Sequence, residues 1–348
     1  MSARIFSADE ISTKKIVEHI LQGHLVAIPT ETVYGLAANA SDEKAIKKIF
    51  QLKNRPADHP LIVHIASPVL GQSVESFWET KLSEWSHDVP PEAILLAKQY
   101  WPGPLTLVLK KAKQVSSLIT GGQETVAIRA PKHPWTIEIL QTFNGGLVAP
   151  SANRFGRISP TTAQHVLDEF QDSETDHELM ILDGGSCDVG IESTILDLSR
   201  LDQMGPIILR PGMILESDIC ATLGITKLGQ KDNAIRHSGG TLGHYAPLTQ
   251  MVSMDVGQLQ VEDVGNQKVV IVTFLDKDVL KNKFATSAID WIHIPLDPPA
   301  VAKQMYQLLR DLDQKGYQKI IIDKLPSSIE WAGIQDRLTR AVYGSGNH

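Results

Sequence analysis

The segment HLVAIPTETVYGL (residues 24–36) begins as a short apolar run and ends in hydroxyl and carboxylate groups. The apolar half predicts a buried strand, and the polar half predicts the turn that follows it. Open α/β sheets bind ligands beyond the carboxyl ends of their strands. Thr30, Glu31 and Thr32 are therefore candidate ligand-binding residues, although a turn whose threonines cap backbone groups would explain them equally well.

Strands of this kind alternate with helices through the first two thirds of the chain. We predict helices at 11–23, at 42–52 with Ser41 as N-cap, at 92–100 and at 160–170, and strands at 61–65, 105–110 and 125–130. Helical and strand periodicities that alternate in this way are typical of an α/β fold with a largely buried sheet.

The pattern changes after residue 215. Residues 216–247 are rich in Gly and polar residues with little periodicity, which predicts an interdomain linker. Strands at 268–275, 291–296 and 319–325, with helices at 299–314 and 329–342, then predict a small parallel-sheet domain. We expect three parts: an α/β domain at 1–215, a linker at 216–247 and a C-terminal α/β domain at 248–348.

The net charge of the chain argues against a protein that binds nucleic acid over its whole surface. The 348-residue chain has a net charge of −7, and residues 1–215 carry 19 Lys/Arg against 25 Asp/Glu. Nucleic-acid binding favours the opposite sign, so we expect weak or no direct binding of nucleic acid. No apolar run approaches the roughly 18 residues of a membrane span, and no signal peptide is evident. The sequence therefore predicts no membrane association. Cys187 and Cys220 are the two cysteines of the chain, and this low cysteine content predicts a cytoplasmic location.

A pair of cations follows the predicted helix at 42–52. Lys53 and Arg55 lie between that helix and Pro56, and Pro60 stiffens the next turn. A fixed Lys/Arg pair suits a polyphosphate, although either cation could simply complement the dipole of the helix C-terminus. His64, within an apolar strand, fits a satisfied core histidine better than a ligand.

Two further segments are dense in small, hydroxylated and cationic residues. The sequence APSANRFGRISPT (149–161) allows close backbone approach to an anion, and it contains no Walker A motif. An ordinary loop with Ser159 or Thr161 as a helix cap is the alternative. Asp183-Gly184-Gly185, residues 190–194 and residues 210–212 show the same bias, although a β-hairpin explains the paired glycines equally well. We interpret WPGPLT (101–106) as a rigid turn that leads into a strand.

Taken in order, these segments resemble one family. PTETVYGL, KNRPADHPLIVH, WPGPLTLVL, TVAIRAPKHP, APSANRFGRISPT, GIESTILDL and ILRPG are similar to the motifs of YrdC-like threonylcarbamoyl-AMP synthases. HYAP (244–247), followed by a second α/β domain, resembles the longer two-domain form. The resemblance implies a YrdC-like twisted open α/β sheet domain, a linker, and a smaller Rossmann-like α/β domain.

The resemblance also implies an activity and a set of site residues. The expected reaction is ATP-dependent synthesis of L-threonylcarbamoyl-AMP from L-threonine and bicarbonate or CO₂, with release of pyrophosphate, for threonylcarbamoyl modification of tRNA adenosine. Mg²⁺ is the expected metal, its ligands are not identified, and downstream tRNA threonylcarbamoyl-transfer proteins are the expected partners. A KxR and an SxN signature fall on Lys53/Arg55, the implied catalytic pair, and on Ser151/Asn153. The implied ATP contacts are Arg55, His59, Thr125, Ser151, Asn153, Ser159, Arg210 and Tyr245, and the implied threonine contacts are Thr32, His64, Arg129, Ala149 and Ser193.

The sequence departs from the family pattern at two places. His59 stands where Asn is commoner, and SGGT (238–241) replaces the more usual SPGM ahead of HYAP. The alternative functions are an RNA-binding or an ATP-binding regulatory module without catalysis. A hydrogenase-maturation carbamoyltransferase is disfavoured, because such chains are much longer and carry CxxC zinc motifs.

Overall fold

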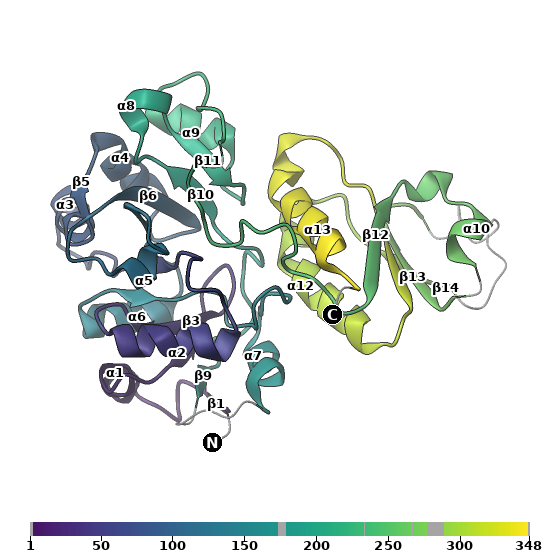
Figure 1. The fold of residues 1–348 in the computed structure, drawn as a ribbon, viewed down its shortest axis with the longest axis horizontal. Coiled ribbons are helices and arrows are strands. Elements are labelled where there is room, and N and C mark those ends of the chain that lie inside the picture. The colour runs from purple at the N-terminus through teal and green to yellow at the C-terminus, as the bar shows by residue number, and fades with distance from the viewer. Residues whose placement is uncertain (1–2, 173–178, 233, 266, 277–288, 347–348) are drawn as a thin grey trace. The chain divides into compact units, whose positions relative to one another are not determined.

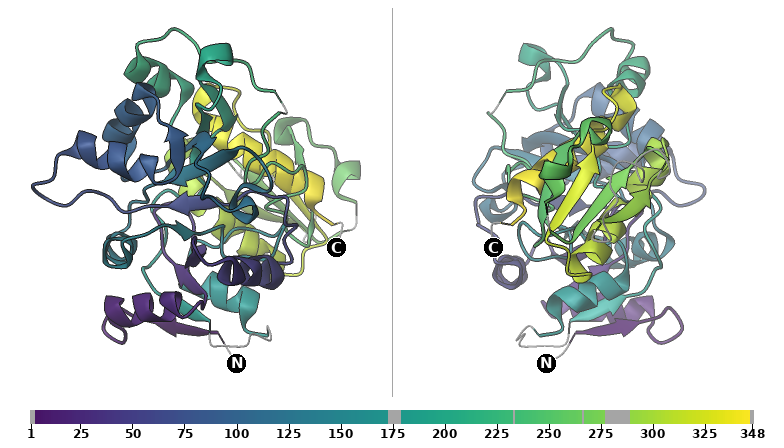
Figure 2. Two further views of the ribbon diagram at one scale, coloured as in Figure 1. Left: turned by 60° about the vertical axis from the view of Figure 1, so that its left-hand side comes forward. Right: turned by 90° about the vertical axis from the view of Figure 1, so that its right-hand side faces the viewer.

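The computed structural model describes residues 3–172, 179–232, 234–265, 267–276 and 289–346. The chain divides into two compact units, which are described separately (Figures 1 and 2). The first comprises residues 1–155 and 159–240, and the second comprises residues 156–158 and 241–348. Within the described ranges, no helix is both long enough and apolar enough to cross a membrane.

One sheet runs through the first unit, in the order β1-β9-β2-β3-β8-β4-β7-β6-β10-β11, with β5 paired to β6. Parallel pairs such as β4–β7 are mixed with antiparallel pairs such as β6–β7. This mixed sheet confirms the predicted twisted α/β domain. Its strands are β1 (Arg4–Phe6), β2 (Val26–Ile28), β3 (Gly35–Asn39), β4 (Ile62–His64), β5 (Ser86–Asp88), β6 (Leu105–Lys111), β7 (Thr125–Arg129), β8 (Leu147–Val148), β9 (Met180–Leu182), β10 (Thr194–Asp197) and β11 (Ile207–Arg210).

Helices connect these strands, and two of them have N-caps that differ from those the sequence predicted. Asp42, not Ser41, is the N-cap of α2, because its carboxylate accepts hydrogen bonds from the Lys44 and Ala45 amides. Thr162, not Ser159 or Thr161, is the N-cap of α7. The helices are α1 (Thr13–Leu21), α2 (Glu43–Lys53), α3 (Val74–Ser83), α4 (Pro91–Tyr100), α5 (Ser117–Thr120), α6 (Pro134–Phe143), α7 (Ala163–Phe170), α8 (Leu201–Met204) and α9 (Glu216–Leu223).

Helix α9 occupies the start of the segment that the sequence predicted to be a linker. Its Ile219 and Cys220 side chains are buried in the core of the first unit. The Tyr100 hydroxyl of α4 donates a hydrogen bond to the Asp218 carbonyl at 2.9 Å, which ties α9 to α4. Two adjacent apolar residues give little periodicity, so the helix was not visible in the pattern.

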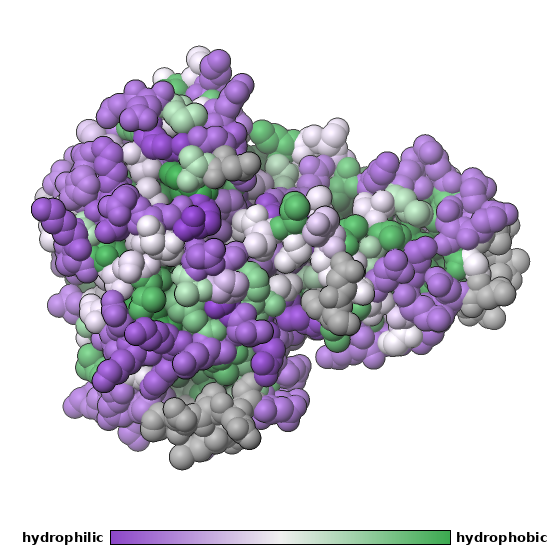
Figure 3. All heavy atoms as spheres, viewed as in Figure 1, coloured by the Kyte–Doolittle hydropathy of each residue, from purple (hydrophilic) through white to green (hydrophobic). Residues whose placement is uncertain are grey.

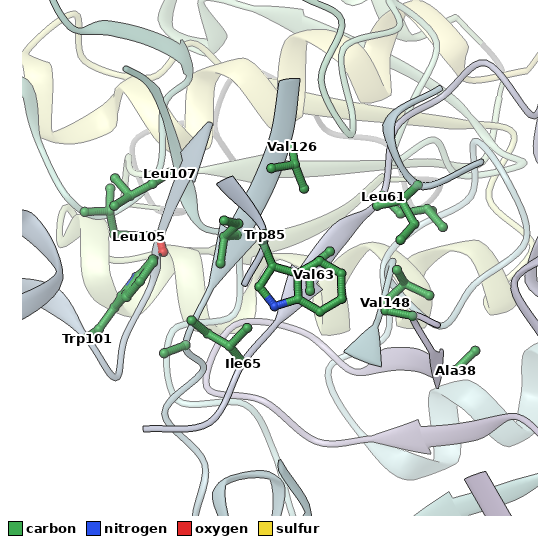
Figure 4. Close-up of a cluster of buried hydrophobic side chains, with 14 of the residues drawn as sticks. Ala38, Leu61, Val63, Ile65, Trp85, Trp101, Leu105, Leu107, Val126 and Val148 are labelled. Atoms are coloured by element: carbon green, nitrogen blue, oxygen red, sulfur yellow. Dashed lines mark hydrogen bonds between the residues drawn. The ribbon is translucent and has the colours of Figure 1, made fainter. Parts of the chain in front are cut away.

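The main core lies on one face of the sheet. Figure 4 shows Val63 of β4, Leu107 of β6 and Val126 of β7 together with Trp85 and Trp101. Burial of each such side chain contributes about 1.5–3 kcal/mol of hydrophobic stabilisation. The outer surface of the first unit is largely hydrophilic in Figure 3, and on α2 the side chains of Lys44 and Lys47 are exposed.

The second unit contains a small parallel sheet in the order β12-β15-β13-β14. Val269 and Ile271 of β13 pack with Val256, while Val270 and Val272 are buried on the opposite face, so both faces are covered. The sheet confirms the predicted C-terminal α/β domain, although β12 was not predicted. Its elements are β12 (Gln250–Met254), η1 (Val256–Gln258), α10 (Val261–Val264), β13 (Val269–Thr273), β14 (Ile289–His293), α12 (Pro298–Gln314), β15 (Lys319–Asp323), η2 (Ile329–Trp331) and α13 (Ala332–Gly344).

Candidate active site

Polar side chains gather on the face of the first sheet that lies opposite the main core. There, Ile62, Val108 and Ile195 form a separate apolar cluster. Residues two positions away on the same strands point to the same face, because side chains alternate along a strand. This alternation places one set of polar side chains beside the cluster: His64, Thr106, Thr125, Arg129 and Ser193.

Lys53 joins the KxR segment to the SxN segment. Its side chain is 1% exposed, and Nζ donates hydrogen bonds to the carbonyl of Ser151, at 2.6 Å, and to the carbonyl of Asn153. Burial, with the Arg55 guanidinium nearby, lowers the pKa of Lys53 well below its ordinary value. The two signatures, about 100 residues apart in sequence, therefore form a single structure.

Arg55 and His59 lie against Phe155, an aromatic side chain of the segment 149–161. Arg55 Nη2 donates a hydrogen bond to the Pro60 carbonyl at 2.9 Å, and its guanidinium lies 5.8 Å from the centre of the Phe155 ring. The His59 ring meets Phe155 edge-on at 4.9 Å. Burial and the Arg55 charge lower the pKa of His59, so this residue favours its neutral form.

Consecutive residues Glu192 and Ser193 connect the two predicted groups of ligand contacts. The Ser159 hydroxyl donates a 2.6 Å hydrogen bond to Glu192 Oε1, and the Ser193 and Thr106 hydroxyls are 2.7 Å apart. Arg210 Nη2 donates to both the carbonyl of Ser193, at 2.9 Å, and its hydroxyl, at 3.2 Å. Ser159 and Arg210, assigned to ATP, are thus linked to Ser193, assigned to threonine.

An ion pair with little solvent exposure stands beside the histidine of this face. Arg129 Nη2 lies 2.8 Å from Glu31 Oε1, and both side chains are 5% exposed. Arg129 Nε donates to the Gly103 carbonyl at 3.2 Å, so the turn interpreted as purely structural also holds a predicted site residue. Burial, reinforced by the Arg129 charge, lowers the pKa of His64 to about 3. His64 is therefore neutral at physiological pH.

The remaining predicted contacts of the first unit lie in two loops after β2 and β8. The hydroxyls of Thr32 and Thr30 are 2.9 Å apart, and Thr30 also donates to the Val33 carbonyl. The Thr30 hydroxyl also accepts hydrogen bonds from the Thr32 and Val33 amides, both at 3.2 Å, so the capping interpretation of this turn holds for Thr30. Ala149 is buried beside β4, where its amide donates to the Ile62 carbonyl at 3.2 Å.

Residues 236–238 of the predicted linker line a pocket on this face together with Thr125, Ile62 and Val108. Arg236 anchors them: Nη2 donates to the Gly121 carbonyl at 2.6 Å, and the backbone amide donates to Gln123 Oε1 at 2.7 Å. Ser238 contributes its carbonyl as an acceptor for Arg210 Nη1 at 3.0 Å. Residues 236–238 of the predicted linker thus belong to the wall of this pocket.

Tyr245 belongs to the second unit. Its side chain is buried there, stacked on Tyr306 at 5.7 Å and with the Arg337 guanidinium 5.7 Å from its ring centre. Gly156–Ile158 belongs to the same unit, since the Ala246 amide donates to the Gly156 carbonyl at 3.0 Å. The segment that directly follows the SxN loop is thus bonded to the HYAP segment.

Sequence reasoning did not assign three residues that the structure places among the predicted contacts: Thr106, Glu192 and Arg236. Each stood close to a recognised motif, since Thr106 ends WPGPLT and Glu192 directly precedes Ser193. Their roles depend on partners far away in sequence, as Thr106 pairs with Ser193 and Arg236 with Gly121. Spacing along the chain carries no signal for such pairs.

The first unit is a mixed α/β sheet domain whose open face carries cations, hydroxyls and a neutral histidine, a set of groups suited to anionic ligands. A sequence model of the Sua5/YciO/YrdC family, described as "Telomere recombination", matches residues 18–212, and one described as "Threonylcarbamoyl-AMP synthase, C-terminal domain" matches residues 212–342. The chain belongs to the threonylcarbamoyl-AMP synthase family and is an enzyme of that family.

Curated relatives and solved structures agree with this assignment. Threonylcarbamoyl-AMP synthases of Pyrococcus abyssi and Bacillus subtilis are 34% and 32% identical, over 92% and 97% of this chain and 91% and 96% of their own lengths. The crystal structure of P. abyssi Sua5 complexed with L-threonine is similar with a TM-score of 0.81 and 32% identity, over 99% of both chains. The alternative of a non-catalytic binding module is not favoured by these relatives.

Proposed function

We propose that the open face of the first sheet binds ATP and L-threonine side by side and joins them through CO₂ or bicarbonate. The observation that supports this proposal is a chain of hydrogen bonds: Ser159 and Arg210, assigned to ATP, bond to Glu192 and to Ser193, and Ser193 is assigned to threonine. The threonine nitrogen attacks the carbon of CO₂ and loses a proton, or attacks bicarbonate with loss of water, and either route gives a carbamate. A carbamate oxygen then attacks the α-phosphorus of ATP, and pyrophosphate leaves.

The ATP half of the proposed site consists of the loop that Lys53 holds. Lys53 fixes Ser151 and Asn153, Arg55 supplies a forked cation, and the predicted contacts His59, Thr125, Ser159 and Arg210 complete the set. The chemistry asks for no protein nucleophile, so positioning and neutralisation of phosphate charge supply the catalysis. Lys53 acts in this proposal through the loop, and Arg55 through the phosphates.

The threonine half of the proposed site consists of Thr32, His64, Arg129, Ala149 and Ser193. The buried Arg129 guanidinium suits the amino-acid carboxylate, and neutral His64 can accept a hydrogen bond from the amine or hydroxyl. The P. abyssi relative, which was crystallised with L-threonine, supports the choice of amino acid.

Mg²⁺ is proposed to enter with the phosphates of ATP. Within the described residues no group of three or more His, Cys, Asp or Glu side chains could form a metal cage. Mg²⁺ is commonly held by substrate phosphates and one or two carboxylates, and Glu192, bonded to Ser159, is placed to supply one. Bound Mg²⁺ would neutralise charge that develops on the phosphates.

The family resemblance also suggests how the reaction is shielded from water and where its product goes. Residues 216–247, with Tyr245, are proposed to act as a linker and lid between a 1–215 catalytic domain and a 248–348 domain, which would shield the unstable carbamate from water. The product is proposed to pass to tRNA threonylcarbamoyl-transfer proteins in the cytoplasm, with weak or no direct tRNA binding by this chain. The acidic balance of residues 1–215 supports that last point.

Substitution of Arg55 by Ala tests the ATP half. Loss of one charge-assisted contact to phosphate removes about 1.5–3 kcal/mol, so we expect a roughly 10- to 150-fold fall in kcat/KM for ATP. The measurement is threonine-dependent release of pyrophosphate. Lys44→Ala, on the exposed side of α2, is the control and should retain wild-type kinetics. Unchanged kinetics in Arg55→Ala would show that Arg55 does not contact the nucleotide.

Substrate choice tests the threonine half. A pocket that hydrogen-bonds a hydroxyl rejects an analogue without it more strongly than one that lacks a methyl group. We therefore expect kcat/KM to fall from threonine to serine by about 10-fold and to fall further for valine. The same pyrophosphate assay, run with each amino acid, gives the ranking. Valine performing as well as serine would mean that the hydroxyl has no partner in the pocket.

A further inference from the structure

We propose that Glu31 is a positioning residue for the amino-acid substrate, which acts by orienting Arg129. This inference rests on the proposed function, in which Arg129 binds the threonine carboxylate. Glu31 lies in the turn after β2, whereas Arg129 ends β7, and their side chains form an ion pair of 2.8 Å with almost no exposure to solvent. None of the contacts assigned to ATP involves either residue.

Glu31 is itself rigidly held. Its Oε2 accepts a hydrogen bond from the Lys132 amide at 2.9 Å, and its carbonyl accepts one from the Val189 amide at 2.7 Å. One hydrogen bond thus holds the carboxylate and another holds the backbone of Glu31. Since Arg129 Nε is bound to the Gly103 carbonyl, the plane of the guanidinium is determined by two contacts.

The ion pair leaves binding capacity for a ligand. Among the described residues, neither Arg129 Nη2 nor Glu31 Oε1 has a well-aligned hydrogen-bond partner, although the two atoms are in ion-pair contact. A buried guanidinium N–H without an aligned acceptor favours an incoming carboxylate. Glu31 therefore does two things: it offsets a buried charge, and it holds the N–H groups in the direction from which the substrate carboxylate is bound.

A purely structural role and a positioning role predict different kinetics. Loss of a structural ion pair would disturb the whole site, so the KM values of ATP and threonine would rise together. Loss of positioning would act on binding of the threonine carboxylate alone, because the hydrogen bonds that hold Lys53 and Arg55 do not involve this pair. The separation of the two KM values is therefore the decisive readout.

The experiment compares Glu31→Gln and Glu31→Asp with the wild type in the full-length protein. Glu31→Gln keeps the length of the side chain but removes its negative charge. We expect the KM for threonine to rise about tenfold or more. We expect kcat and the KM for ATP to change less than about threefold. Glu31→Asp, which keeps the charge, should show a smaller rise. Glu75→Gln, which removes an exposed 2.8 Å ion pair with Lys98, is the matched control and should leave all constants unchanged.

A double variant keeps the test decisive if Glu31→Gln folds poorly. Glu31→Gln/Arg129→Met removes both buried charges, and it should bind threonine as weakly as Arg129→Met alone, because Glu31 acts only through Arg129. Equal rises in both KM values, an unchanged or lower KM for threonine, or additive losses in the double variant would overturn the proposal. A wild-type protein without threonine-dependent pyrophosphate release would instead overturn the proposed function.

Discussion

Replacement of Lys53 by Met should lower the free energy of unfolding by about 3 kcal/mol and the activity by about 100-fold or more. The substitution leaves the carbonyls of Ser151 and Asn153 buried without their donor, at about 1–3 kcal/mol each. It also frees the SxN loop from α2, and a displacement of about 1 Å in a positioning loop can cost about 100-fold in rate. Urea unfolding and pyrophosphate release measure the two effects.

Lys48→Met provides the control for this experiment. Lys48 lies on the same helix, and its Nζ also donates to a backbone carbonyl, that of Gly23 at 2.8 Å, which belongs to no predicted contact. We expect a modest loss of stability and full activity. If Lys53→Met retained both the stability and the ATP KM of the wild type, the SxN loop would not depend on Lys53.

The second large effect concerns stability at acidic pH. Burial and the Arg129 charge lower the pKa of His64 to about 3, whereas the ordinary value in an unfolded chain is about 6.5. Below about pH 6.5 the unfolded state therefore binds a proton that the folded state does not bind. The stabilisation by His64 is present above that pH and is lost as the pH falls toward 3. At about 1.4 kcal/mol per pH unit, roughly 3 kcal/mol disappears by pH 4.5.

A His64→Gln variant isolates this contribution. Its free energy of unfolding should depend less on pH between 7 and 4.5 than that of the wild type, by about 3 kcal/mol, as measured by urea unfolding at both pH values. His87→Gln, at an exposed position on β5, is the comparison variant and should retain the wild-type dependence. Parallel stability curves for His64→Gln and the wild type would mean that His64 gains its proton in the folded protein.

Local patterns predicted the elements that have a clear period or a strong cap. The strands near 61–65, 105–110 and 125–130 and the parallel sheet of the second unit follow from apolar runs. Helix α9 and strand β12 were missed because their buried faces rest on a few residues. The cap of α2 moved by one residue, since the choice between Ser41 and Asp42 depends on which side chain reaches the Lys44 amide.

The sequence by itself determined the family, the α/β class and the residues of the motifs, because these depend on residue type and order. Only the tertiary structure decided which of those residues contact one another. Lys53 holds the loop of Ser151 and Asn153, and Glu31 meets Arg129 across about 100 residues of chain. The physical reason is that such contacts need the sheet to bring separate strands to one face, and burial then strengthens each charge. Lys53, which the sequence suggested as a phosphate ligand, instead holds the loop of Ser151 and Asn153 by hydrogen bonds in the folded protein.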